Sequence, residues 1–285
     1  METQAGTHPP QDVAVIRISD QRYPPLLREI ADPPAQLYVR GNAAILLRED
    51  LVAVVGMRQM TRYGETVAGR LAGSLACAGV PVVSGLALGI DAAAHEAVLA
   101  SGGVAIAVLA AGVADNDIGP RANFGLAKRI LATGGALISE FPSGTPATKE
   151  KFPLRNRIVA GLTKATVVVE AAERSGALIT ARLALESGRD VFAVPGPITS
   201  LASHGTNKLI ASGAIPILSE SSLLEALGLD SATRDTAALT DDERAVLAKI
   251  DRGATSPDAI AEATGLPPRR VAAALATLAM HGRKS

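Results

Sequence analysis

Short apolar runs alternate with amphipathic segments along residues 51–227. The runs are rich in β-branched residues and are, in chain order, LVAVVG, GVPVVSG, GGVAIAVLA, GALISE, ATVVVEA, DVFAVPG and AIPILS. Such continuous runs are typical of strands buried on both faces of a sheet, and helical segments between them imply right-handed crossovers. The pattern therefore predicts a doubly wound, mostly parallel sheet of the α/β class over residues 51–227.

A different pattern precedes this region. Residues 1–50 are rich in proline and charge, and Tyr23-Pro24-Pro25 and Asp32-Pro33-Pro34 interrupt their short apolar pieces. Proline restricts the backbone to extended and turn conformations. We therefore expect an N-terminal lead-in segment that has little core of its own and lies over the following domain.

Small, polar and turn-forming residues dominate 228–239, which predicts a linker. Residues 240–285 then carry helix signals: Thr240 with Glu243 three positions on, Ser256-Pro257 at a second start, and Gly265 at its end. Three short helices with a glycine-containing turn predict helix-turn-helix topology. Because the sequence stops where a β-wing is expected, we describe 240–285 as a truncated winged-helix-like domain.

Composition narrows the choice of partners. The 28 basic and 28 acidic residues give a formal net charge of zero, so a nucleic-acid surface requires local clustering of charge. Cys77 is the single cysteine, and its apolar neighbours predict a buried small hydrophobe. The N-terminus lacks signal-peptide blocks and no apolar stretch reaches the roughly 20 residues of a membrane span, so we expect a cytoplasmic protein. The four histidines show no metal-ligand spacing, and we predict no metal site.

The first candidate motif is VVGMRQMTRYG, at the end of the first predicted strand of the sheet. A glycine there lets backbone amides approach phosphate, and the following helix N-terminus adds partial positive charge. Gly56 and Arg58 are therefore candidate phosphate-binding residues. Arg58 replaces the second glycine of the dinucleotide fingerprint and Ser84-Gly85 ends the next strand without an acid, so we predict no NAD or other cofactor. A tight turn with a solvated arginine explains the motif equally well.

The second motif is the basic segment Lys149–Arg157, KEKFPLRNR. Its four basic residues and one acid give a local charge of +3, and Phe152 lies among them in a chain that is only 2% aromatic. Basic groups that contact phosphates beside an aromatic ring that stacks on a base are what a single-strand groove requires. The structural alternative is a phenylalanine in the core at the start of a solvated helix.

The third motif places Ser175 and Gly176 at the start of a helix that follows the strand ATVVVEA. A hydroxyl and free amides at a helix start form an anion-binding nest, although an ordinary N-cap serine has the same sequence. Asp91 and His95 are four residues apart, for which we expect a structural contact. No set of nucleophile, base and orienting group is present, and we predict no catalytic residues and no enzymatic activity.

Together the blocks GMRQMTRYG, VVSGLALGIDAAAHEAVL, FPLRNRIVAGL, VVEAAERSGALITARLALESGRDVFAVPG and SHGTNKLIASGA resemble, in order, the DprA (Smf) family. The lead-in YPPLLREIADPPAQLYVRG is also similar to the family's segment at this place. The resemblance implies an extended Rossmann-like domain that binds single-stranded DNA, forms a homodimer and assists loading of the RecA recombinase in natural transformation. It also implies a winged-helix appendage of variable role.

Site residues follow from the matching motifs. The resemblance implies that Gly56 and Arg58 hold a phosphate and that Phe152 lines the base pocket. The remaining residues are predicted to contact the strand or form the pocket floor: Lys151, Arg155, Asn156, Ser175 and Gly176. Two residues depart from the family pattern, since Met57 replaces a small residue and Gly119 replaces a tyrosine.

Two rival functions remain open. The first is a Rossmann-like nucleotide sensor or a phosphoribohydrolase-like enzyme, although Thr180 and Ala181 stand where such hydrolases carry a catalytic acid. The second is a transcription regulator that binds DNA through Arg269 and Arg270 at the start of the last predicted helix. Residues 240–285 carry seven Lys/Arg against six Asp/Glu, so a protein-contact module or a structural cap fits that domain as well.

Overall fold

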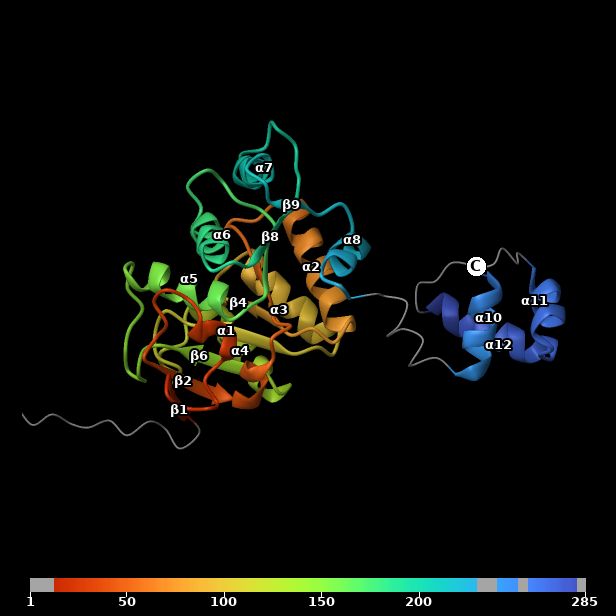
Figure 1. Cartoon of the computed structure of the whole chain (residues 1–285), viewed down its shortest axis with the longest axis horizontal. Helices are drawn as coiled ribbons and strands as arrows, with labels where there is room; N and C mark the ends of the chain where they lie inside the picture. Colours follow the sequence, from red (N-terminus) through yellow and green to blue (C-terminus); the bar gives the residue numbers. More distant parts are fainter. Residues whose placement is uncertain (1–12, 230–239, 251–255, 281–285) are drawn as a thin grey trace, which may run out of the picture. The chain divides into compact units, whose positions relative to one another are not determined.

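The computed structural model describes residues 13–229, 240–250 and 256–280, which fall into two compact units divided after Leu227. The first unit is built around one nine-stranded sheet (Figure 1). Its strands are β1 (Val13–Arg17), β2 (Gln36–Gly41), β3 (Val52–Val55), β4 (Val82–Ser84), β5 (Ala105–Val108), β6 (Ala136–Ser139), β7 (Ala165–Val168), β8 (Asp190–Ala193) and β9 (Ile215–Pro216).

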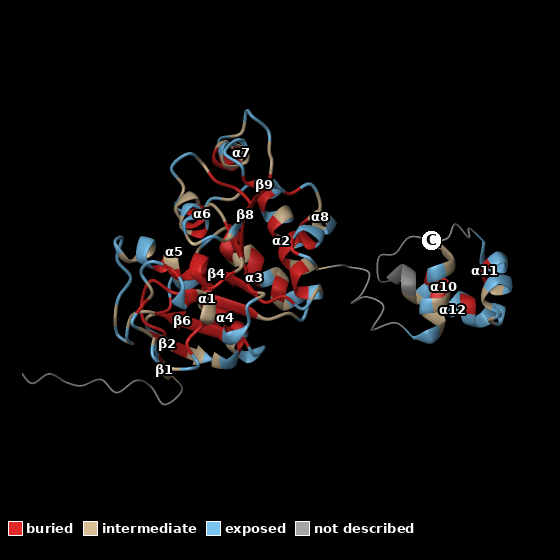
Figure 2. Cartoon of the chain, in the orientation of Figure 1, coloured by how far each residue is buried: buried red, intermediate tan, exposed pale blue. Residues whose placement is uncertain are grey.

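The strand order is β1-β2-β6-β5-β4-β3-β7-β8-β9. Strands β3 to β9 pair in parallel, whereas β1 and β2 join β6 as an antiparallel edge. The seven apolar runs of the sequence are the seven parallel strands, and most of their residues are buried (Figure 2). The predicted doubly wound, mostly parallel α/β sheet is therefore confirmed.

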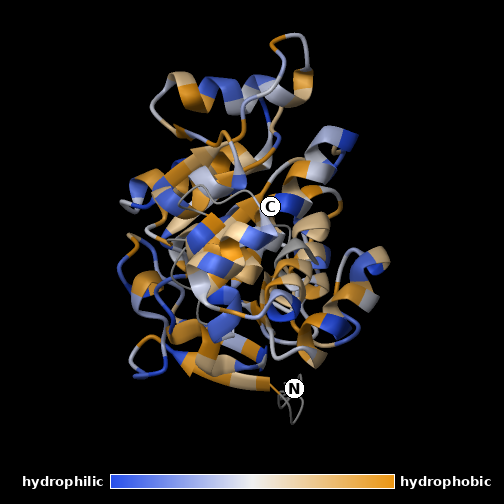
Figure 3. Cartoon of the chain, turned by 90° about the vertical axis from the view of Figure 1, so that its right-hand side faces the viewer, coloured by the Kyte–Doolittle hydropathy of each residue, from blue (hydrophilic) through white to orange (hydrophobic). Residues whose placement is uncertain are grey.

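The helices of the first unit are α1 (Pro25–Arg28), α2 (Arg62–Cys77), α3 (Ile90–Ala100), α4 (Phe124–Ala132), α5 (Lys151–Gly161), α6 (Gly176–Glu186), α7 (His204–Ala211) and α8 (Glu220–Ala226), with 3-10 turns at Ala43–Leu47, Arg121–Asn123 and Leu201–Ser203. Helices α2 to α7 lie between successive parallel strands, whereas α1 lies between β1 and β2 and α8 follows β9. Helix α3 packs against α2 and α4, while α5 packs against α6 and α1. Hydrophobic and hydrophilic residues both occur along the helices, as amphipathic helices require (Figure 3).

The N-terminal segment differs from the expectation of a lead-in without a core. Residues 13–50 supply two strands of the sheet, and Tyr23 and Leu27 are almost fully buried. The Tyr23 hydroxyl donates to the carbonyl of Pro34 at 2.7 Å. Helix α1 packs so closely on α5 that a Cβ at Gly161 would lie 2.9 Å from Leu27. The prolines thus shape turns between buried apolar pieces, and the segment supports helix α5.

The second unit consists of α10 (Asp241–Ile250), α11 (Pro257–Thr264) and α12 (Pro268–Met280). Thr240 and Glu243 form the expected reciprocal cap, with a 2.7 Å bond from the Thr240 amide to the Glu243 carboxylate. Gly265 ends α11 in the left-handed conformation at φ 70°. The helices enclose a small core of Val246, Leu247, Ile260, Val271 and Ala274. Most of the predicted linker, 230–239, lies outside the described residues.

Two further observations concern expectations from the sequence. Cys77 is exposed, because it is the last residue of α2 and faces outward, so the expectation of a buried cysteine is wrong. None of the described helices has the length and apolar character that a membrane span requires.

Candidate functional site

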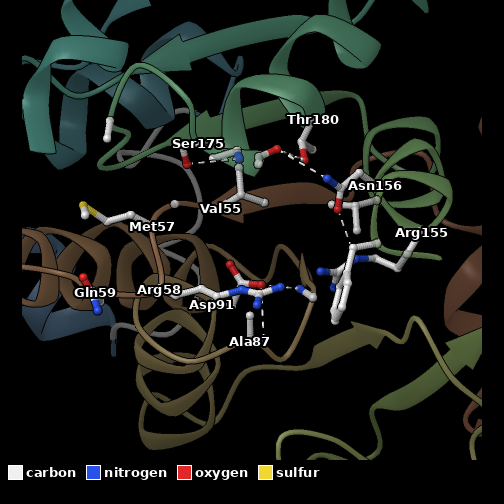
Figure 4. Close-up of a pocket in the computed structure, with 17 residues that line it drawn as sticks. Val55, Met57, Arg58, Gln59, Ala87, Asp91, Arg155, Asn156, Ser175 and Thr180 are labelled. Atoms are coloured by element: carbon white, nitrogen blue, oxygen red, sulfur yellow. Dashed lines mark hydrogen bonds between the residues drawn. The ribbon is translucent and has the colours of Figure 1, made fainter. Parts of the chain in front are cut away.

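One pocket of the first unit lies at the topological switch point of the sheet. From β3 the chain proceeds outward through β4, β5 and β6, and it then returns to place β7 on the other side of β3. In such sheets the crevice between diverging crossovers, at the carboxyl ends of the strands, is the expected ligand site. A pocket of about 470 Å³, here called the central pocket, is lined by the segments after β3, β4 and β7 and by helix α5 (Figure 4).

Arg58 supplies an exposed positive charge to the central pocket. Its guanidinium carbon lies over the ring of Phe152, 4.7 Å from the centroid. Within the described part of the chain Arg58 forms no ion pair, so its charge is not neutralised there by an acidic side chain. A guanidinium stacked on an aromatic ring keeps its edge free for the oxygens of a phosphate.

Glu170 fixes the segment that carries Arg58. This glutamate is 2% exposed and follows β7. Its carboxylate accepts hydrogen bonds from the amide of Thr61 at 2.9 Å and from the hydroxyl of Thr61 at 2.5 Å. Its backbone carbonyl accepts from the amide of Met57 at 2.9 Å. Arg58 therefore lies on a turn that is held at both ends, which reduces the entropy lost on binding a ligand.

The start of helix α6 forms the opposite wall. Ser175 is its N-cap and accepts from the amide of Ala177 at 3.3 Å, and the first amide of the helix, at Gly176, has no acceptor within the helix. Asn156 on α5 donates to the carbonyl of Gly176 at 3.3 Å. Figure 4 shows Ser175 across the pocket from Arg58. The helix terminus adds partial positive charge to the same space.

Two buried ionisable residues, Arg155 and Asp91, form the floor of the central pocket. Arg155 is 6% exposed and donates to the carbonyl of Val108 at 2.9 Å and to Asn156 at 3.1 Å. Burial lowers the pKa of its guanidinium, while burial raises the pKa of the neighbouring Asp91 carboxyl. The Asp91 carboxylate accepts from the amides of Gly85 and Ala87 at 3.1 and 3.3 Å. Asp91 thus orders the turn after β4 and partly balances the charge of Arg155.

Gly85 is required by this arrangement. A Cβ at Gly85 would lie 1.6 Å from Nη1 of Arg155, so the guanidinium occupies the space that a side chain would need. Gly85 and Asp91 were not among the predicted site residues, although both belong to the glycine-rich block SGLALGID. Both residues could have been predicted from the sequence, because that block follows a strand whose carboxyl end lies at the same edge of the sheet.

His95 does not make the contact with Asp91 that its spacing suggested. It is fully buried, and neither ring nitrogen has a hydrogen-bond partner among the described residues. Burial, with a smaller effect of the nearby Arg155 charge, lowers the pKa of His95 to about 3. The imidazole is therefore neutral at physiological pH and contributes no charge to the site.

Most of the predicted site residues meet in the central pocket. Its lining includes Gly56, Arg58, Phe152, Arg155, Asn156, Ser175 and Gly176. Lys151 differs, since its ammonium donates to the carbonyl of Pro146 at 2.6 Å and lies 5.1 Å from the ring centroid of Phe141. The assignment of DNA contacts to these residues stays a prediction, and it is weakest for Lys151.

Fold and pocket together define a doubly wound α/β protein with a pocket at its switch point that is lined by Arg58, Arg155 and the start of α6. The chain is matched over residues 14–228 by the family described as DNA recombination-mediator protein A, and over 230–283 by the DprA winged helix domain. The chain belongs to the DNA recombination-mediator protein A family, which confirms the resemblance to DprA (Smf) proteins.

Similar proteins come from several bacteria. Protein Smf of Escherichia coli is 42% identical over 281 residues, covering 94% of this chain and 74% of the relative. The X-ray structure of DNA processing protein A from Streptococcus pneumoniae is 40% identical with a TM-score of 0.70, covering 75% of this chain and 74% of the other. DNA processing protein A of Helicobacter pylori, whose structure concerns its single-stranded DNA binding mode, is 29% identical with a TM-score of 0.69, covering 76% and 96%.

Proposed function

We propose that this chain binds single-stranded DNA through the central pocket and handles incoming DNA in natural transformation. The observation that carries the proposal is the unneutralised Arg58 opposite the start of α6, with Phe152 beside it. Cation, helix amides and aromatic ring are the groups that a backbone phosphate and its base require. The single-stranded DNA binding mode of the Helicobacter pylori relative supports the same assignment.

The proposed role is that of a mediator without catalytic turnover. DNA bound in the pocket would be passed to the RecA recombinase, and the family description as a recombination mediator supports this part of the proposal. A cytoplasmic location belongs to the same proposal, because the recombinase would be met there. The measurement is the rate of recombinase filament formation on strands coated with single-strand binding protein, which the chain is expected to increase.

A homodimer is also part of the proposal. Ile198, Leu201 and Leu218 are 85%, 73% and 80% exposed, and they follow the neighbouring strands β8 and β9. Large exposed apolar residues in adjacent segments are typical of an interaction surface. Light scattering should therefore give twice the chain mass, and Leu201→Asp with Leu218→Asp should give a folded monomer.

The decisive experiment measures fluorescence anisotropy of labelled oligo-dT across a salt series. Arg58→Ala should weaken binding about tenfold or more, because a hydrogen bond to a charged group contributes about 1.5–3 kcal/mol. It should also flatten the dependence on salt, since one fewer phosphate is neutralised. Lys151→Ala should have a smaller effect, because its ammonium already bonds to Pro146.

Arg182→Ala is the matched control, since Arg182 is an exposed arginine on α6 that pairs with Glu186 at 3.3 Å and does not line the pocket. The affinity of Arg182→Ala for oligo-dT should equal that of the unmodified chain. A folded chain that does not bind the strand at low salt would contradict the proposal. Binding that is independent of strand length, with equal affinity for a free mononucleotide, would favour the nucleotide sensor instead.

A further inference from the structure

A second cavity, here called the Tyr63 cavity, lies at the same edge of the sheet as the central pocket. Its volume is about 660 Å³. It is lined by Thr61, Arg62 and Tyr63 at the start of α2, by Glu170 after β7, and by residues of the segment 195–203 that follows β8. The cavity is therefore formed where three neighbouring strands of the sheet end.

The central pocket and the Tyr63 cavity follow each other along this edge. Residues 56–59, which come after β3, line the central pocket, and residues 61–63 of the same segment line the Tyr63 cavity. The strands below them also continue in order, because β3 pairs with β7 and β7 pairs with β8. A strand of DNA that leaves the central pocket across this segment therefore reaches the Tyr63 cavity next.

Tyr63 gives the cavity a flat aromatic surface. It is 46% exposed, although its hydroxyl donates to the carbonyl of Pro195 at 2.9 Å. That hydrogen bond joins the start of α2 to the segment after β8 and holds the tip of the ring. An exposed aromatic ring that is already held in place loses little entropy when a base stacks on it, and every base has a face that can stack.

Arg62 supplies positive charge beside this ring. It is exposed, and within the described part of the chain its guanidinium forms no ion pair and no hydrogen bond. Glu170 also lines the cavity, but it is 2% exposed and both of its carboxylate oxygens accept from Thr61. Ser203 is 3% exposed, and its hydroxyl has no hydrogen-bond partner among the described residues. The accessible charge of the cavity is thus that of Arg62, which suits a phosphate.

We propose that the Tyr63 cavity is a second subsite for the bound strand, in which a base stacks on Tyr63 and the adjoining phosphate contacts Arg62. The inference rests on the proposed strand binding and extends the path of the strand beyond the central pocket. A basic groove with an aromatic platform is the combination that binds single strands without regard to sequence. Ile198 and Leu201, which are proposed for the dimer, do not line this cavity, so the two proposals use different side chains.

The first test uses Tyr63→Trp, which gives the chain a single tryptophan because the sequence contains none. Stacking of a base should quench the fluorescence of this tryptophan when oligo-dT binds. Tyr38→Trp is the matched control, because Tyr38 is half-buried on β2 and lines neither cavity. We expect quenching at position 63 and none at position 38. Unchanged fluorescence at position 63 with oligo-dT bound would overturn the subsite.

The second test measures the affinity for short and long oligo-dT. Tyr63→Leu should weaken binding of long strands about tenfold, the effect of one lost base stack, and should leave binding of strands that fill only the central pocket unchanged. Tyr63→Phe should bind long strands like the unmodified chain, since the ring remains while the bond to Pro195 is lost. Arg62→Ala should flatten the salt dependence for long strands only. Arg70→Ala is its control, because Arg70 lies on α2, pairs with Glu220 and lines neither cavity.

The outcomes separate the subsite from strand binding itself. Long strands that bind Tyr63→Leu as tightly as the unmodified chain would overturn the subsite. An equal loss of affinity in Tyr63→Phe and Tyr63→Leu would do so too, because it assigns Tyr63 a structural role through its hydroxyl. A changed mass in light scattering together with lost affinity would assign the cavity to a subunit contact instead. In all three cases short strands would still bind and Arg58→Ala would still weaken them, whereas an unmodified chain that binds no strand of any length would overturn the proposed function as well.

Discussion

In the first unit Arg58 extends into the central pocket with no acidic partner among the described residues, whereas in the second unit Arg270 pairs with Asp242, with 2.6 Å between Nη2 and Oδ1. Both arginines are exposed and both lie in sequence contexts that suggest a DNA contact. Only Arg58 faces a helix N-terminus across a pocket. An arginine indicates a ligand site when the fold leaves its charge uncompensated, and a basic residue alone does not.

The two units also differ in how deeply their ionisable residues are buried. Beneath the central pocket Asp91, His95 and Arg155 are all less than 9% exposed, while Arg270 in the second unit is 56% exposed. Buried ionisable groups are costly unless they are paired or neutral, and they concentrate at functional sites. The second unit contains such groups only at its surface, within the residues that the structure describes. We therefore expect low pH, substitutions and salt to change the stability and ligand binding of the first unit far more than those of the second unit.

The largest expected effect concerns His95. The folded chain keeps this imidazole neutral down to about pH 3, whereas the unfolded chain protonates it near 6.5, so protons favour unfolding between these values. His95→Met removes this contribution. The free energy of unfolding of His95→Met, relative to that of the unmodified chain, should rise by about 1.4 kcal/mol for each pH unit below 6.5. The rise should total about 4–5 kcal/mol near pH 3. Denaturant unfolding across pH measures the difference.

His204→Met is the control, because His204 lies nearer the surface and bonds to the carbonyl of Ile198 at 3.1 Å. The raised pKa of Asp91 acts in the opposite sense, since the folded chain takes up that proton before the unfolded chain does. Comparison of His95→Met with the unmodified chain cancels that contribution. A difference that does not change with pH would show that His95 titrates alike in both states.

The next effect concerns the space beneath the pocket. Gly85→Ala would place a Cβ 1.6 Å from Nη1 of Arg155, so the guanidinium must move. We expect a loss of about 1–3 kcal/mol in stability, as for other overpacked sites, together with weaker strand binding. Gly69→Ala in α2 is matched to it, because a Cβ there meets no atom within 4 Å. That variant should gain about 0.5–1 kcal/mol, and equal stability of the two variants would contradict the packing argument.

Much of this fold follows from local pattern. The seven parallel strands were predicted from apolar runs because strands buried on both faces need such residues. The site segments were predicted because carboxyl ends of parallel strands meet at one edge. Strands β1 and β2 were missed, since their place depends on long-range antiparallel pairing such as Tyr38 with Ser139. The orientation of the Lys151 side chain could not be predicted from the sequence either, because it depends on spatial neighbours such as Phe141.

The smallest effect is expected in the second unit. Arg270→Ala removes an ion pair whose side chains are 56% and 20% exposed, and exposed pairs contribute less than about 1 kcal/mol. Combined with Arg269→Ala, it should change the affinity for oligo-dT less than about twofold, since the pocket that holds the phosphate is intact. The same anisotropy assay, run beside Arg58→Ala, measures both contributions.

The double variant also decides what the second unit does. If affinity falls as much as for Arg58→Ala while the protein stays folded, the Asp242 pair must open when DNA binds, and α12 would be a second DNA-binding element. The absence of an acidic partner at Arg58 and its presence at Arg270 would then not distinguish a DNA-binding arginine from a structural one. If affinity is unchanged but recombinase loading is lost, the start of α12 contacts a protein. The pairing of Arg270 with Asp242 favours that second outcome over DNA contact, because a neutralised guanidinium attracts phosphate weakly.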